Sequence, residues 1–462
     1  MTRQLMRHFP MAGIHVLAMP FPGRGHINPT MNLCKLLALT KPNILITFVV
    51  TEEWLGYIGA DPTPPNLRFA TIPNVIPSER LKASDFRGFS EAVVTKMEAP
   101  FEQLLDRLQP PVTAIIGDLE LRWPIAVGRR RNIFVASLWT MSATFFSMLY
   151  RADISARVRR LPTNWFGHGD EVDQISGLSS THKADLGKVF EENDSRVMEI
   201  ILDCISRVPK ADCLLFTSFY EFEPEMVEIL KLELPFPIYT IGPAIPYFEL
   251  ENEPQVANND GCNYQQWLDC QPADSVLYIS LGSFLSVSAS QMDEIASGLR
   301  NSGVRFLWVA RGDAPRLKEQ CGEKGLVVPW CEQLKVLCHS SVGGFWSHCG
   351  WNSTLEAVFA GIPMLTFPLF LDQSPNSTHI VEDWKLGCRV QRTKVGTETL
   401  IVKEEISEIV RRFMDLSSSE GKQMRDRAKK LKDICHRATF EGGSSRHNLD
   451  EFIRSISEGD TK

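Results

Sequence analysis

Short apolar runs that look like buried strands alternate with longer amphipathic segments along almost the whole chain, and this alternation constrains the fold more than any other feature. From residue 14 to about 243, the runs contain few polar residues, and helical spacing of apolar residues appears between most of them. Uninterrupted apolar strands with helices between them are typical of a parallel sheet that is covered on both faces. The runs are IHVLAMP (14–20), NILITFVVT (43–51), VTAIIGD (112–118), NIFVASLW (132–139) and CLLFTSF (213–219).

A polar segment, 244–263, interrupts the alternation with acidic and amide residues and prolines, as an interdomain linker does. The alternation then resumes, and 462 residues exceed what one hydrophobic core usually supports. We therefore predict an α/β fold of two Rossmann-like, doubly wound domains facing a cleft, over 1–243 and 264–462. The strands predicted in the second domain are SVLYISLGS (275–283), VRFLWVA (304–310), GLVVPW (325–330), SVGGFWSH (341–348) and PMLTFP (363–368).

Charge and cysteine usage exclude several classes of protein. A net charge of -7 and a pI near 5.9 argue against a nucleic-acid partner. The 11 cysteines are an odd number without a CxxC pair, which suits a reducing compartment and offers no zinc-binding spacing. No apolar run reaches the roughly 18 residues that span a bilayer, and the first run lacks a clear signal-peptide cleavage site. These features predict a soluble cytoplasmic protein without stable membrane insertion.

The turn after the first predicted strand, MPFPGRGHINP (19–29), carries the first candidate for chemistry. It lacks the third glycine of a dinucleotide-binding G-x-G-x-x-G, because Asn28 occupies that place. His26 stands at the mouth of the predicted sheet and is a candidate general base if a carboxylate orients its ring. Asp118 ends another predicted strand at the same sheet edge and suits that role, although it could equally be the N-cap of a following helix.

The stretch SVGGFWSHCGWNSTLEAVFAGIP (341–363) carries a denser signal. A predicted strand ends near His348 and a helix begins near Asn352, where free backbone N–H groups and the helix dipole favour a diphosphate. Ser353 and Glu356 also fit a capping box, which would give both a purely structural role. Capping does not account for His348 or for the glycines, so a ligand site stays open as an interpretation.

The segment from Trp330 to Gln373 strongly resembles the signature box of plant UDP-dependent glycosyltransferases of small molecules. The family's other landmarks also have counterparts, so the resemblance covers almost the whole chain. It implies the GT-B architecture of two Rossmann-like domains and leaves room for the last helix to pack back on the N-terminal domain. The further counterparts are GHINP (25–29), IGP (241–243), QWLDCQPADSVLYISLGS (266–283) and EGGSS (441–445).

Carried over position by position, the resemblance assigns roles in both predicted domains. His26 and Asp118 fall on the family's catalytic base and on its carboxylate partner. Trp330 is expected to stack on the uracil, beside Gln333, and Glu356 to accept hydrogen bonds from the ribose hydroxyls. The remaining expected UDP-sugar contacts are Ser283, His348, Asn352 and Ser353 for the diphosphate, and Thr140, Trp351, Asp372 and Gln373 for the sugar.

The reaction that the resemblance implies is an inverting transfer of a sugar from a UDP-sugar to a hydroxyl or carboxyl group of a small lipophilic acceptor. A phenolic, a terpenoid or a hormone fits that description, and Gln373 favours glucose as the sugar. Phe86, Phe89, Met141 and Phe145 are candidate acceptor contacts, with a core role as the alternative. The UDP-sugar is a substrate, so no cofactor, no metal and a monomeric enzyme are expected.

Two other classes of protein stay open on the sequence. A non-catalytic protein that binds a sugar nucleotide or another small molecule would keep the box and lose the base, and the presence of both His26 and Asp118 counts against it. A Rossmann-type NAD(P)-dependent oxidoreductase would share the alternation of strands and helices, but it should carry a better glycine fingerprint than the one found here.

Overall fold

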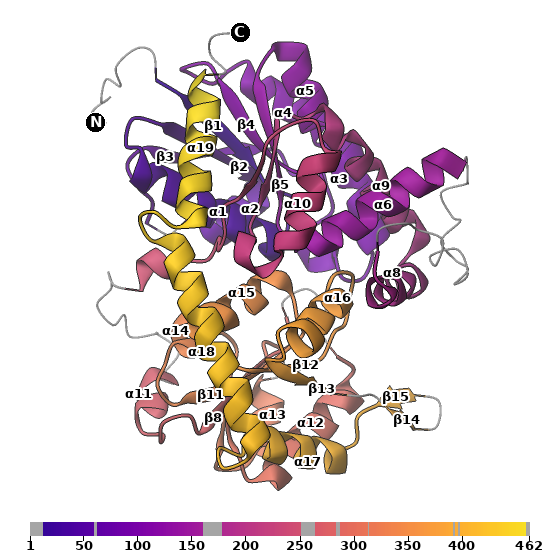
Figure 1. The fold of residues 1–462 in the computed structure, drawn as a ribbon, viewed down its shortest axis with the longest axis vertical. Coiled ribbons are helices and arrows are strands. Elements are labelled where there is room, and N and C mark those ends of the chain that lie inside the picture. The colour runs from indigo at the N-terminus through magenta and orange to yellow at the C-terminus, as the bar shows by residue number, and fades with distance from the viewer. Residues whose placement is uncertain are drawn as a thin grey trace. The chain divides into compact units, whose positions relative to one another are not determined.

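The computed structural model describes residues 13–59, 62–159, 178–250, 264–282, 287–312, 314–390, 393–395 and 398–458. They form two compact units, which Figure 1 draws in colours that follow the chain. The first takes in the described residues of Met1–Leu161, Asp194–Ala244 and Ser444–Lys462, and the second those of Pro162–Asn193 and Ile245–Gly443. Most of the predicted linker lies outside the described residues, so the domain boundaries proposed from the sequence stay predictions.

The strands of the first unit are β1 (His15–Met19), β2 (Leu45–Thr51), β3 (Leu67–Ile72), β4 (Ala114–Asp118), β5 (Phe134–Trp139), β6 (Cys213–Phe216) and β7 (Ile238–Thr240). They form one parallel sheet in the order β3-β2-β1-β4-β5-β6-β7. Strand β1 pairs with β2 through Val16 and Ile46, and with β4 through Met19 and Gly117. The winding reverses between β1 and β4, and doubly wound sheets bind their ligands at such a switch point.

The helices of the first unit are α1 (Arg24–Thr40), α2 (Glu52–Ile58), α3 (Phe86–Lys96), α4 (Glu98–Leu105), α5 (Pro124–Arg131), α6 (Ala143–Arg159), α9 (Ser195–Arg207), α10 (Pro224–Glu233) and α19 (Ser444–Glu458). They cover both faces of the sheet. Successive side chains of a strand point to opposite faces, so each face is apolar and packs against its own set of helices. In β1, Val16 and Ala18 join a core with α1, α2 and α19, whereas Leu17 and Met19 join a core with α3, α4 and α5. Figure 1 shows the yellow helix α19 lying over this sheet.

Two strands of the first sheet were not predicted from the sequence. Strand β3 lies at the edge of the sheet, where the exposed Arg68 interrupts the apolar run. Strand β7 lies at the other edge and has only 3 residues. Edge strands need no continuous apolar run, because one of their sides meets solvent or a loop.

The strands of the second unit are β8 (Val276–Ser280), β9 (Arg305–Val309), β10 (Gly325–Val328), β11 (Val342–Ser347), β12 (Met364–Thr366) and β13 (Gly387–Arg389), with a separate antiparallel pair β14 (Thr393–Val395) and β15 (Glu398–Leu400). The first six form a parallel sheet in the order β10-β9-β8-β11-β12-β13. The winding reverses between β8 and β11, so this sheet has a switch point of its own. The prediction of two doubly wound α/β sheets is confirmed.

In the second unit, α12 begins after its N-cap Ser288, and α15 begins after Gly350, close to the start near Asn352 that the sequence predicts. Helix α16 is short, because it passes into the single wide turn η6 and the chain then enters β13. Within the described residues, no helix is both long and apolar enough to cross a membrane. The helices are α8 (Ser180–Glu192), α11 (Tyr264–Asp269), α12 (Ala289–Ser302), α13 (Ala314–Gln320), α14 (Gln333–Leu337), α15 (Trp351–Ala360), α16 (Gln373–Thr378), η6 (His379–Asp383), α17 (Lys403–Phe413) and α18 (Ser419–Thr439).

Candidate active site

His26 stands in the first turn of α1, just beyond the carboxyl end of β1. The backbone N–H groups of His26 and Ile27 both donate to the Gly23 carbonyl, at 3.0 and 2.8 Å. These two hydrogen bonds form the first turn of the helix. The Phe21 ring packs against the imidazole, with the two ring centroids 5.1 Å apart. The imidazole is therefore held at the switch point of the first sheet, and only 18% of its side chain is exposed.

Asp118 and Thr140 both contact the same nitrogen of His26. The Asp118 carboxylate oxygen Oδ2 lies 2.8 Å from His26 Nδ1, and the Thr140 hydroxyl lies 3.2 Å from that nitrogen. Asp118 ends β4 and Thr140 follows β5, so three neighbouring strands supply the group. Asp118 is not a helix N-cap, because α5 begins only at Pro124. Thr140, expected near the sugar, thus lies against the candidate base.

A second carboxylate beside the imidazole, that of Glu120, was not predicted from the sequence. Its carboxylate oxygen Oε2 lies 3.9 Å from His26 Nε2, the nitrogen that faces away from Asp118. Its backbone N–H donates to Asp118 Oδ1 at 3.0 Å, which fixes the turn after β4. An acidic residue two positions after a strand-terminal aspartate was the signal available in the sequence.

The charges around His26 determine the protonation of the group. Burial works against a charged imidazolium, but the carboxylates of Asp118 and Glu120 outweigh it and raise the pKa of His26 above its usual value. Burial also raises the pKa of Glu120, while the positive charges of His26 and Lys82 oppose that shift. The two carboxylates thus stabilise the protonated form of the His26 imidazole.

Gly23 has a specific steric role in the turn before His26. The Lys82 ammonium donates to the Pro22 carbonyl at 2.7 Å, in front of the Phe21 and Phe89 rings. A Cβ atom on Gly23 would lie 2.3 Å from Lys82 Nζ. The glycine therefore makes room for a buried lysine, whose pKa is lowered by burial.

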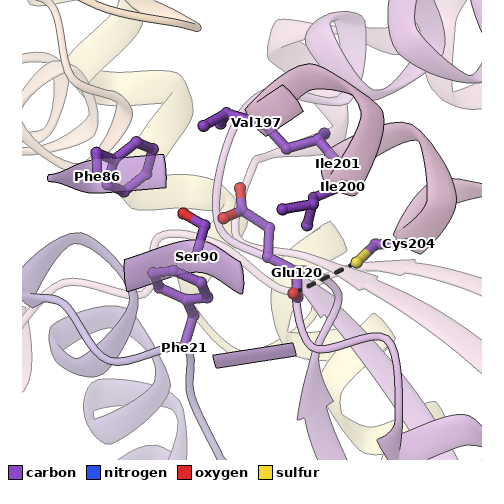
Figure 2. A pocket seen from close by; sticks show the side chains of 8 residues that line it. All are labelled: Phe21, Phe86, Ser90, Glu120, Val197, Ile200, Ile201 and Cys204. Carbon is purple, nitrogen blue, oxygen red and sulfur yellow. Dashed lines mark hydrogen bonds between the residues drawn. The ribbon is translucent and has the colours of Figure 1, made fainter. Parts of the chain in front are cut away.

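One pocket of the first unit lies directly beside this group, and Figure 2 shows its lining. Phe86, a predicted acceptor contact, is part of that lining. Phe89, Met141 and Phe145 are buried in the core and do not line it. The lining residues are Phe21, Phe86, Ser90, Glu120, Val197, Ile200, Ile201 and Cys204.

In the second unit, His348 and the start of α15 lie at the switch point between β8 and β11. Helix α15 begins at Trp351 with Gly350 as its N-cap, and no side chain caps it. The first backbone N–H groups of a helix have no partner within the helix, so they remain for a ligand or solvent. Asn352 and Ser353 lie in this first turn. Ser283, the fourth expected diphosphate contact, lies outside the described residues.

Two glycines make room for the imidazole of His348. A Cβ atom on Gly282 would lie 2.9 Å from His348 Cδ2, and one on Gly350 would lie 2.6 Å from Nε2. Gly282 also has a φ of +93°, which side chains disfavour. The surrounding protein displaces water from the ring and lowers the pKa of His348 to about 4, although a backbone hydrogen bond with Ser280 opposes the shift. His348 is therefore neutral near pH 7 and can act there as a hydrogen-bonding group, not as a cation.

Gln333 forms hydrogen bonds with both Ser353 and Glu356, the two residues of the capping-box pattern. Its amide nitrogen donates to Ser353 Oγ at 2.9 Å and to Glu356 Oε2 at 2.5 Å, while its carbonyl oxygen accepts from the Tyr278 hydroxyl at 3.1 Å. Ser353 and Glu356 therefore face Gln333 and do not cap α15. Desolvation raises the pKa of Glu356 to about 7, against the opposing effect of the Gln333 bond.

The aromatic and sugar-contact candidates differ in exposure. Trp330 is 54% exposed, so one face of its indole is available for stacking. Trp351 is buried against Trp384, and its indole nitrogen Nε1 has no hydrogen-bond partner among the described residues. Asp372 Oδ2 accepts from Asn376 at 2.7 Å. Gln373 Oε1 accepts from two backbone N–H groups, of Leu369 and Phe370, which fixes its side chain.

Comparison with known proteins gives matches over almost the entire chain. A model of the family described as UDP-glucoronosyl and UDP-glucosyl transferase matches residues 209–412. UDP-glycosyltransferase 87A2 of Arabidopsis thaliana is 52% identical over 451 residues, 96% of each chain. Os79 of O. sativa, solved with U2F and trichothecene, covers 96% of this chain and 100% of its own, with a TM-score of 0.81 and 28% identity. Phytolacca americana UGT2, solved with UDP-2fluoro-glucose and pterostilbene, covers 96% and 99%, with a TM-score of 0.78 and 26% identity.

Proposed function

The chain belongs to the plant UDP-glycosyltransferase family and is a UDP-glycosyltransferase of small molecules, and we propose that it transfers glucose with inversion to a small lipophilic acceptor. The group glycosylated is a hydroxyl or a carboxyl, of a phenolic, a terpenoid or a hormone. The observation that carries the proposal is the 2.8 Å contact between His26 Nδ1 and Asp118 Oδ2. UDP-2fluoro-glucose and pterostilbene in the Phytolacca americana relative support a glucose donor and a small-molecule acceptor.

His26 is the proposed base. The Asp118 carboxylate accepts a hydrogen bond from the Nδ1–H group, so the lone pair of the neutral imidazole lies on Nε2. Nε2 takes the proton of the acceptor hydroxyl while its oxygen attacks the anomeric carbon. The carboxylate of Asp118 then stabilises the imidazolium, as the aspartate of a hydrolytic triad does. The raised pKa of His26 fits this sequence of events, because it favours the protonated product of the step.

The leaving group is UDP. As the new bond from the acceptor oxygen to the anomeric carbon forms, the bond from that carbon to the diphosphate oxygen breaks, which gives a β-glucoside from an α-linked donor. The backbone N–H groups at the start of α15, together with the side chains of Asn352 and Ser353 and the neutral His348, are proposed to stabilise the negative charge on the diphosphate. Ser283 is proposed to join them on the grounds of the family motif alone.

The nucleoside is proposed to bind between an aromatic face and a carboxylate. The exposed indole of Trp330 stacks on the uracil, with Gln333 beside it. Glu356 accepts hydrogen bonds from both ribose hydroxyls, and this requires its ionised form for full strength. Gln333 already donates to Glu356, so the carboxylate is oriented before the ligand arrives.

The affinity for UDP-glucose is expected to fall as the pH is lowered through about 7, the pKa to which Glu356 is raised. Protonation removes the negative charge that the ribose hydroxyls meet, so binding should weaken about tenfold between pH 8 and pH 6. Calorimetric titration with UDP-glucose measures this, and Glu356→Gln should bind more weakly at pH 8 with a flat profile. An equally steep profile in the variant would assign the titration to another group.

Gln373 is proposed to select glucose. Its oxygen is held by the Leu369 and Phe370 N–H groups, which leaves the NH2 group to donate to a sugar hydroxyl. Gln373→His is expected to lower the ratio of kcat/KM for UDP-glucose over UDP-galactose about tenfold, because a lost hydrogen bond to a substrate hydroxyl costs about that much. Paired assays with the two donors and one acceptor measure the ratio. A ratio that stays constant would remove Gln373 from sugar selection.

Incubation with UDP-glucose and a panel of phenols and alcohols tests the proposed function as a whole. The expected products are UDP and a β-glucoside, which the anomeric proton coupling in NMR identifies. An α-glucoside would contradict the single displacement. Tight binding of UDP-glucose without transfer to any acceptor would favour a non-catalytic binding protein.

A further inference from the structure

Glu120 is a buried carboxylate that the proposed reaction does not use. Only 8% of the residue is exposed, and none of the described residues donates a hydrogen bond to its carboxylate. A carboxylate removed from water normally has such partners, because leaving its oxygens unsatisfied costs free energy. The nearest charged group that the structure describes is the His26 imidazole, 3.9 Å away, so the carboxylate oxygens remain available to water or to a ligand.

The Glu120 carboxylate points into the pocket beside His26. Figure 2 shows it between Phe86 and Ser90 on one side and the branched side chains of helix α9 on the other. The remaining walls are almost wholly apolar, so Glu120 and Ser90 supply the polar side chains of the lining. The free space inside is about that of a single water molecule, which fits a hydroxyl and not a ring.

The position of the carboxylate relative to the base restricts what can bind. Glu120 Oε2 and His26 Nε2 are 3.9 Å apart, and both accept hydrogen bonds. One hydroxyl has a single proton and cannot donate to both. Two hydroxyls on adjacent carbons can each make a bond of about 2.8 Å, one to the nitrogen and one to the oxygen. The pair is thus spaced for a diol.

We propose that Glu120 determines which acceptors are used: its carboxylate binds a second hydroxyl next to the one that His26 deprotonates, so acceptors with adjacent hydroxyls are preferred. The inference rests on the proposed function, because it requires His26 as the base. It narrows the acceptor class to neutral vicinal diols, either aliphatic or of the catechol type. Glu120 is a specificity-determining residue and takes no proton in the reaction.

The same carboxylate disfavours acids as acceptors. An acceptor carboxylate held at His26 would lie beside both Asp118 and Glu120, in a site with little water. Neighbouring carboxylates cannot all remain ionised, so one must take up a proton at a cost in binding. Glucosylation of hydroxyls is therefore preferred over the formation of glucose esters.

Three acceptors of one shape test the proposal: 2,3-dihydroxynaphthalene, 2-naphthol and 2-naphthoate. The wild type is expected to show a kcat/KM for the diol that is about 10- to 100-fold above that for 2-naphthol, the effect of one hydrogen bond to a charged group. Glu120→Leu should abolish this advantage. Glu120→Gln keeps an oxygen acceptor without the charge, so it should retain much of the diol preference and use 2-naphthoate better than the wild type.

Two controls separate specificity from general damage. Ile200→Val changes the same pocket by one methyl group and should leave the diol ratio as in the wild type. Calorimetric binding of UDP-glucose reports that each variant is folded. An unchanged ratio in Glu120→Leu, or an equal loss with all three acceptors, would overturn the assignment. Absence of transfer to every acceptor by the wild type would instead refute the proposed function.

Discussion

His26→Ala is expected to lower kcat/KM for an alcohol acceptor about 10³-fold and to leave the affinity for UDP-glucose within about twofold. The first effect follows from the loss of a general base, which typically contributes 10²- to 10⁴-fold. The second is expected because the proposed nucleotide contacts belong to the second unit, on α14, on α15 and in the turns before them, whereas His26 belongs to the first unit. Steady-state assays of UDP release and calorimetry measure the two quantities on the same preparation.

Variants of the two partners of Nδ1 provide the comparison for His26→Ala. Asp118→Asn keeps the shape but offers the ring an NH2 group, so the wrong tautomer is favoured and a loss of about 10²-fold is expected. Thr140→Val removes only the longer 3.2 Å contact and should cost a few-fold at most. Wild-type turnover in His26→Ala would show that another group removes the proton.

Gly350→Ala is expected to weaken UDP-glucose binding about 100-fold, although the substitution adds a single methyl group. The new Cβ atom would lie 2.6 Å from His348 Nε2 and 3.2 Å from Cε1, distances that force the ring to move. The backbone of Gly350 has a φ of -60° and a ψ of 140°, which alanine adopts readily, so the effect is steric. The diphosphate would then lose its contacts with the displaced His348 ring and with the shifted start of α15.

Gly312→Ala is the matched control for Gly350→Ala. It lies in the same unit, and a Cβ atom there would meet nothing within 4 Å. Binding of UDP-glucose and the melting temperature should match the wild type in this variant. Wild-type affinity in Gly350→Ala would mean that His348 and the start of α15 do not hold the diphosphate.

Much of the fold could be predicted from the sequence, because buried parallel strands are continuous apolar runs. The strands around both switch points, β1, β4, β8 and β11, all follow that pattern. Strands β3, β7 and β13 could not be found in the same way, since β3 is partly exposed at an edge and the other two are both short and at the edge of their sheets.

The candidate site was predictable where a strand end carries an unusual residue, and unpredictable where the contact depends on packing. His26 follows β1 and Asp118 ends β4, two strands that are neighbours in the sheet although the residues are 92 apart in sequence, so the topology was needed to join them. The capping-box pattern of Ser353 and Glu356 was misleading, because α15 begins before it. Lys82 gave no signal at all, since only its contact with the turn at Gly23 brings it to the site.

The measurement that tests the central claim most directly compares wild type and His26→Ala with a series of phenols of decreasing pKa at one pH. If His26 removes the acceptor proton, a phenol that is already ionised no longer needs it. The account predicts that the wild-type advantage falls from about 10³-fold with a weakly acidic phenol to within about tenfold with a phenol ionised at the assay pH. An advantage that stays the same across the series would contradict a general-base role for His26.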